Sequence, residues 1–128
     1  MKVTIADFEV IRDRSFALAV GGDIDRTFDF ELPTDILTNT AAVLSLVLNR
    51  ISAATQLRID INGTGVYDTR PGAGAVRCVQ EALPPVLRAG ANQIVFTVAT
   101  GEAVLSDVVL WYKRGGLGGA FGGQGSSG

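Results

Sequence analysis

Alternation of apolar and polar residues along the chain predicts several short β-strands. Side chains of a strand point alternately to its two faces, so apolar residues at every second position indicate a strand with one buried face. Segments 15–20 and 27–32 show this alternation, and 57–62 shows it most clearly, with apolar Leu, Ile and Ile between polar residues. The dipeptide Asn62-Gly63 at its end is typical of tight turns that need positive φ angles.

Later segments extend the same pattern. Segments 92–99 and 103–113 are rich in β-branched and aromatic residues and are separated by Thr100-Gly101-Glu102, which predicts a hairpin. Segment 41–51 fits a short amphipathic helix or a strand buried on both faces, and its place in a series of short elements favours the strand. Pro84 and Pro85 exclude a central strand there. We expect about eight to ten strands and little helix, as in an all-β, single-domain antiparallel β-sandwich.

The composition changes sharply after Arg114. Residues 115–128 hold half of the 16 glycines and no charged residue, which is typical of a flexible tail. We therefore expect a sandwich domain over residues 1–114 and a Gly-rich tail over 115–128. Leu117 and Phe121 are the sizeable apolar groups of this tail and are candidate anchors on a protein partner.

Composition excludes several classes of function. The chain has 128 residues, 47% of them hydrophobic, with a formal net charge of −2 and no histidine. The charge gives no reason to expect nucleic acid or an anionic membrane. The missing histidine excludes Ser-His, Cys-His and His-metal chemistry. The longest apolar run, 41–48, is too short for a membrane-spanning helix. The single cysteine, Cys78, is expected to be a small buried side chain.

The amino end contains acids at Asp7 and Glu9, before any long apolar core of a secretory signal could form. We therefore expect no signal peptide and synthesis in the cytoplasm. Incorporation into a virion or an extracellular assembly is compatible with this start.

Three segments carry a resemblance to a known family. LRIDING (57–63), VLRAGANQIVFTV (86–98) and AVLSDVVLWYKR (103–114) resemble the second half of the galactose-binding-domain-like β-sandwiches, jelly-roll modules appended to many carbohydrate-active enzymes. In that family a strand ends in an Asn-Gly turn, a Leu-x-x-Gly-x-Asn loop leads into another strand, and the last strand carries an Asp. The resemblance covers about half of the chain and implies the jelly-roll fold.

We expect no cofactor, and the resemblance adds a structural Ca²⁺ as a candidate. Asp23 and Asp25 in an acidic loop are candidate ligands, and Asp107 on the last strand could approach them. Calcium takes six to eight oxygen ligands, of which Asp23 and Asp25 supply two, so a solvated turn is the favoured interpretation of this loop.

Two groups of residues are candidates for ligand binding. Tyr67, Asp68 and Arg70 combine an aromatic ring with an acid and a guanidinium beside a Pro-Gly bend, although the two charges could simply pair and the ring could cover the core. Trp111 and Tyr112 are adjacent and must point to opposite faces of a strand. One of them belongs to the core, and the other stacks on a sugar, contacts a subunit or covers an edge.

These observations leave three classes of function. The favoured one is a non-catalytic structural or assembly subunit, such as a virion or tail accessory protein that self-associates or binds a protein partner. The alternative is a carbohydrate-binding module that recognises a glycan. A carboxylate-dependent hydrolase comes last, because nothing singles out a catalytic pair among Asp29, Glu31, Asp60 and Asp107. We expect no enzymatic activity.

Overall fold

The computed structural model describes residues 2–73 and 76–117, which form nine strands and no helix. The strands are β1 (Lys2–Arg12), β2 (Phe16–Ala19), β3 (Asp25–Leu32), β4 (Ala42–Ile51), β5 (Gln56–Ile61), β6 (Thr64–Thr69), β7 (Arg77–Leu83), β8 (Gly90–Thr100) and β9 (Glu102–Leu117). A membrane-spanning helix is accordingly absent from the part of the chain that is described.

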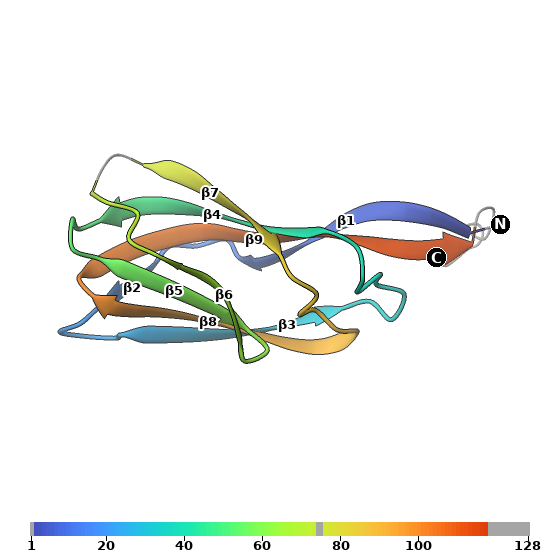
Figure 1. Ribbon diagram of the computed structural model, residues 1–128, viewed down its shortest axis with the longest axis horizontal. Coiled ribbons are helices and arrows are strands. Elements are labelled where there is room, and N and C mark those ends of the chain that lie inside the picture. The colour runs from blue at the N-terminus through green and yellow to red at the C-terminus, as the bar shows by residue number, and fades with distance from the viewer. Residues whose placement is uncertain (1, 74–75, 118–128) are drawn as a thin grey trace.

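The strands form two antiparallel sheets that lie face to face (Figure 1). The first sheet has the order β1-β9-β4-β7, and β2 pairs with β9 on the same side as β1. The second sheet has the order β3-β8-β5-β6. This arrangement confirms the predicted all-β, antiparallel β-sandwich of jelly-roll type.

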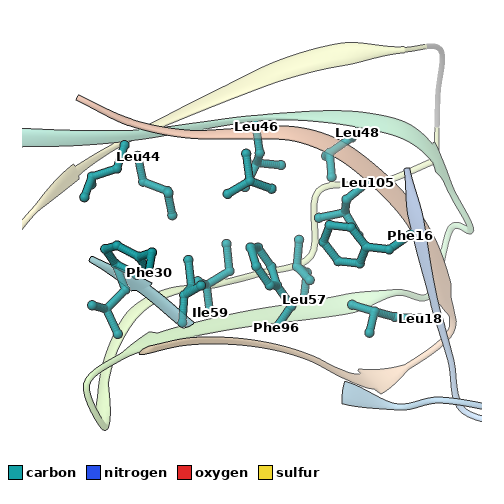
Figure 2. Close-up of a cluster of buried hydrophobic side chains, with 14 of the residues drawn as sticks. Phe16, Leu18, Phe30, Leu44, Leu46, Leu48, Leu57, Ile59, Phe96 and Leu105 are labelled. Carbon is teal, nitrogen blue, oxygen red and sulfur yellow. The ribbon is translucent and has the colours of Figure 1, made fainter. Parts of the chain in front are cut away.

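The core lies between the two sheets and consists mainly of inward-facing residues of β2, β3, β4, β5, β8 and β9 (Figure 2). Leu44, Leu46 and Leu48 of β4 are at most 2% exposed, whereas the residues between them are half-buried on the outer face. Segment 41–51 is therefore a strand, as predicted, but it buries only one face completely. Phe96 of β8 packs edge-on against Phe16 of β2, with ring centroids 5.1 Å apart, and joins the two sheets.

The predicted turns have the predicted backbone geometry. Asn62 and Gly63 connect β5 to β6 with φ angles of 51° and 83°, both in the left-handed region. Gly101 reverses the chain between β8 and β9 with φ 78°. Asparagine and glycine tolerate this region better than other residues, which explains why these positions could be identified from sequence.

Three strands are not evident from the sequence. β1 places Asp7 and Glu9 on the inner face and Phe8 and Val10 on the outer face, so its pattern does not indicate a buried side. β6 includes Tyr67–Thr69, which we expected in a loop. β7 is an edge strand that ends just before the two prolines. Its Cys78 is exposed, so the expectation of a buried thiol is wrong.

β9 continues to Leu117, three residues past the expected end of the sandwich domain. Gly115, Gly116 and Leu117 extend the strand because β1 supplies backbone partners for them, from Thr4 to Lys2. Together β1 and β9 form a two-stranded arm that projects from the sandwich (Figure 1). Residues 118–128, which include Phe121, lie outside the described residues, as does the side chain of Leu117.

Arg114 holds the base of this arm. Its guanidinium makes ion pairs of 3.2 Å with Asp7 of β1 and 2.9 Å with Asp35 of the loop between β3 and β4. The hydrogen bond with Asp35 is the main cause that raises the pKa of Arg114. The arm is thereby attached to the sandwich by side chains as well as by the sheet.

Candidate functional site

The outer faces of the two sheets differ in polarity. On the second sheet, Arg58 forms an ion pair of 3.1 Å with Asp60, whose hydrogen bonds raise the pKa of Arg58. On the first sheet, the outer face presents Phe8, Val10 and Trp111, which are 52%, 46% and 47% exposed. Large exposed apolar side chains that cluster on one face indicate a binding surface.

This cluster follows from the strand register. Phe8 of β1 lies opposite Trp111 of β9, which lies opposite Val43 of β4. In the next row, Val10 lies opposite Val109. We call these five residues the aromatic face. The rings of Phe8 and Trp111 are in contact, with centroids 5.3 Å apart and planes tilted by 39°.

Trp111 is held in one orientation. Its indole Nε1 donates a hydrogen bond of 2.9 Å to Oγ of Ser45 on β4, and Phe8 supports its other side. A groove of about 260 Å³ runs beside the indole and is lined by Ala6, Val43 and Lys113 among others. The aromatic face is thus a rigid strip of rings with a cationic group at its margin.

Tyr112 points the other way, as expected for the neighbour of Trp111. It is 6% exposed and belongs to the core, so its ring is not accessible for stacking on a sugar. Burial raises the pKa of the Tyr112 phenol, and the nearby charge of Asp7 raises it further. Of the two adjacent aromatics, only Trp111 is available to a ligand.

The raised pKa of Tyr112 predicts destabilisation at alkaline pH. Because the folded state holds the phenolic proton more tightly, its contribution to stability is complete below the ordinary pKa of 10.0. That contribution is lost as the pH rises through the folded-state value. We therefore expect the melting temperature to fall as the pH rises above the ordinary phenol pKa of 10.0. Burial also raises the pKa of Tyr67, so a Tyr67→Phe, Tyr112→Phe variant should show a flatter profile. An unchanged slope in that variant would contradict this assignment.

The other predicted ligand-binding residues differ in burial. Tyr67 faces the sandwich interior on β6 and packs against the core. Asp68 faces outward and accepts a hydrogen bond of 2.6 Å from Nε2 of Gln56, whose Oε1 accepts one of 3.0 Å from Arg70. Alternation along β6 thus turns the Tyr67 ring toward the core and the Asp68 carboxylate outward, and ligand binding by these three residues stays a prediction.

The three candidate calcium ligands are not brought together. Asp23 lies in the turn between β2 and β3, and Asp25 is the first residue of β3. Asp107 lies in β9 with φ 52° and accepts a hydrogen bond of 2.8 Å from Oγ of Ser106. Among the described residues, no three acidic or cysteine side chains are grouped as metal ligands would be. The structural Ca²⁺ stays a prediction, now without Asp107 as a partner of the other two.

The sequence did not identify a polar pocket on the second sheet. It has a volume of about 380 Å³ and lies where the Asn62-Gly63 turn meets the loop that leads into β8. Arg88, Asn92 and Gln93 line it from that loop and strand, and Asp29 lines it from β3. We call it the turn pocket. The sequence contains the motifs that form this pocket, the Asn62-Gly63 turn and the Leu-x-x-Gly-x-Asn loop at 87–92, but we interpreted both only as connections between strands.

The aromatic face was also identified only in part. Trp111 was a candidate. Phe8 was not, because the strand that carries it, β1, was not predicted and Phe8 lies on the outer face of that strand. A search for large apolar residues opposite acidic ones, as in the sequence Asp7-Phe8-Glu9-Val10, could have found it.

Comparison with known proteins shows a likeness of fold. No protein-family model and no curated protein matches the chain. Among solved structures, it is similar to a β-porphyranase of glycoside hydrolase family 86 from the gut bacterium Bacteroides plebeius, with a TM-score of 0.63, 19% identity, and coverage of 91% of this chain and 22% of that one.

Two further structures show the same likeness. One is latent PorU from Porphyromonas gingivalis, with a TM-score of 0.57, 15% identity, and coverage of 88% of this chain and 13% of that one. The other is the exo-β-1,3-galactanase of Phanerochaete chrysosporium with galactose, with a TM-score of 0.50, 18% identity, and coverage of 84% and 29%. The chain thus spans less than a third of each of these proteins. It has the galactose-binding-like β-sandwich fold that the three sequence segments indicated.

Proposed function

We propose that the chain is a non-catalytic carbohydrate-binding module that binds a polysaccharide on its aromatic face. The observation that carries this proposal is the pair of exposed, mutually supported rings of Phe8 and Trp111 on the outer face of the first sheet. The apolar face of a sugar ring stacks on an aromatic ring, and two adjacent rings offer a sugar chain a continuous surface.

The surroundings of Trp111 suit this role. Its hydrogen bond to Ser45 orients the indole before a ligand arrives, so little conformational entropy is lost on binding. Lys113 at the groove offers an ammonium group to sugar hydroxyls. β9, which carries Trp111, is paired on both sides, by β1 and by β4, and this pairing limits movement of the backbone beneath the rings.

The names of the similar structures suggest the ligand class. One is a β-porphyranase and another is an exo-β-1,3-galactanase with galactose. We infer that polymers containing galactose are the first ligands to test. The same comparisons support carbohydrate binding more than the assembly role that the sequence favoured. The assembly role is kept as a distinct outcome of the experiment, because an apolar face also suits a subunit contact.

The test uses Trp111, which is the only tryptophan of the chain. Porphyran and β-1,3-galactan should change its fluorescence, and calorimetry should show that Trp111→Ala weakens binding by at least about tenfold. The matched control is Val20→Ala, which removes a residue that is 54% exposed outside the aromatic face and should leave affinity unchanged.

Two outcomes would contradict the proposal. Glycan binding that survives Trp111→Ala would place the ligand elsewhere. The chain could instead bind neither polymer and show, in light scattering, concentration-dependent self-association that Trp111→Ala abolishes. That result would favour the assembly role for the same face.

A further inference from the structure

The turn pocket lies in the other layer of the sandwich from the aromatic face. Its walls come from β3, from the β5–β6 turn and from the segment that leads into β8, all in the second sheet. Its volume of about 380 Å³ is within the range of small-molecule sites, near the lower end. A ligand of one or two sugar rings would fill it, whereas a polymer chain would need a longer groove.

Two asparagines build the frame of this pocket. The Nδ2 of Asn62 donates hydrogen bonds of 2.8 Å to the carbonyl of Val86 and to Oδ1 of Asn92, and its Oδ1 accepts one of 2.9 Å from the amide of Gln93. Asn92 is 3% exposed, and its Nδ2 donates to the carbonyls of Arg88 and Gly90. The amide groups of both asparagines are thereby used within the protein, and they fix the turn against the loop.

Three other side chains keep their hydrogen-bonding capacity open. Arg88, Asp29 and Gln93 are exposed and line the same pocket. Within the described residues, the Arg88 guanidinium makes no ion pair or hydrogen bond, and the Asp29 carboxylate has a single long contact, of 3.4 Å, with Nε2 of Gln93. The pocket thus offers a ligand a hydrogen-bond donor in Arg88, an acceptor in Asp29, and both kinds of group in the amide of Gln93.

The charges of these groups restrict the ligand. Asp29 repels a phosphate or carboxylate, and Arg88 repels a metal cation, so the pocket favours a neutral molecule. A carboxylate accepts hydrogen bonds from two neighbouring hydroxyls, and a guanidinium donates to hydroxyl or ring oxygens. Polyols both donate and accept at adjacent positions, and sugars are polyols of this size.

We propose that the turn pocket is a second binding site, which takes a single neutral sugar residue through Asp29, Arg88 and Gln93. Among its described lining residues there is no aromatic ring, so recognition depends on the direction of hydrogen bonds rather than on stacking. Such a site distinguishes epimers and suits the end of a glycan chain or a free monosaccharide. The choice of galactose as the first probe rests on the proposed function, but the existence of the pocket does not.

The experiment is a titration of the full chain with galactose, followed by amide chemical shifts in ¹H–¹⁵N spectra. We expect saturable shifts at Gly63, Ala91 and Gln93, which line the pocket. Asp29→Asn and Arg88→Ala should each weaken this binding by at least about tenfold, because each removes a charged hydrogen-bond partner. Glucose and mannose serve as epimeric probes and should bind differently from galactose.

Controls separate this site from the aromatic face. Glu31→Gln changes an exposed acid of the same strand, two residues from Asp29, and should leave galactose binding unchanged. Trp111→Ala should also leave it unchanged. Well-dispersed spectra of each variant show that the fold persists.

The outcomes of the two proposals are distinguishable. If none of the three sugars shifts the pocket amides, or if Asp29→Asn and Arg88→Ala bind galactose as the unmodified chain does, the second site is refuted. Polymer binding that depends on Trp111 would then still stand. If the pocket binds galactose but Trp111→Ala leaves the affinity for the polymers unchanged, the second site is supported and the proposed role of the aromatic face is refuted.

Discussion

Replacing Phe96 by alanine is expected to lower the free energy of unfolding by about 3–5 kcal/mol. Phe96 is fully buried and is the largest of the side chains that have essentially no exposed surface. Its ring makes an edge-on contact with Phe16, at a centroid distance of 5.1 Å (Figure 2). A second edge-on contact joins it to Phe28, at a centroid distance of 6.0 Å. Since Phe16 comes from the first sheet and the other two from the second, alanine would leave a cavity across the sandwich.

Urea denaturation would measure this loss as a lower midpoint with an unchanged slope. Phe96→Leu is the matched control, because it keeps an apolar side chain at the same place and should lose about a third to a half as much. A loss below about 1 kcal/mol for Phe96→Ala would show that the two sheets close over the gap, and would contradict the role assigned to this ring.

Replacing Gly101 by alanine is expected to cost more than about 3 kcal/mol, through two effects. The first is backbone strain, because Gly101 has φ 78°, a conformation that is unfavourable for residues with a side chain. The second is collision. A Cβ at this position would lie 2.7 Å from Cα of Thr55 and would overlap its Oγ1. Thr55 is fully buried and its hydroxyl donates a hydrogen bond of 2.8 Å to the carbonyl of Glu102, so it cannot move aside freely.

Gly63→Ala separates the two effects. Gly63 has φ 83°, but a Cβ there would meet no atom within 4 Å. We expect this variant to lose only the strain, about 1–2 kcal/mol. Thermal or urea unfolding of both variants provides the comparison. Equal losses would mean that collision with Thr55 contributes nothing, and the tight approach of the β8–β9 turn to the β4–β5 turn would have to be reconsidered.

Local sequence pattern was sufficient for the strands with one consistently apolar face and for the turns that need glycine or asparagine. β5 is the clearest example, since Leu57, Ile59 and Ile61 alternate with polar residues and all three are fully buried. The same local rule placed Trp111 and Tyr112 on opposite faces. It also explains why the family resemblance in three short segments was enough to predict the sandwich.

The predicted ligand-binding residues show what the local sequence pattern could not predict. Tyr67, Asp68 and Arg70 are close in the sequence and look like one loop, yet Tyr67 lies in the pairing of β6 with β5, opposite the buried Ile59. Pairing of β6 with β5 decides the side to which each residue points. That pairing is a contact between strands, and it determines that the ring is inside and the acid outside.

By itself, then, the sequence determined that this chain is an antiparallel sandwich, which of its segments form most of the strands, and that one of two adjacent aromatics near the end lies outside the core. Only the tertiary structure decided that β1 pairs with β9, which places Phe8 beside Trp111, and that the Asn62-Gly63 turn meets the loop before β8 to form the turn pocket. The physical reason is that alternation and turn preferences act over a few neighbouring residues. The order of strands in a sheet depends instead on how distant apolar faces are buried together, and both candidate sites are products of that order.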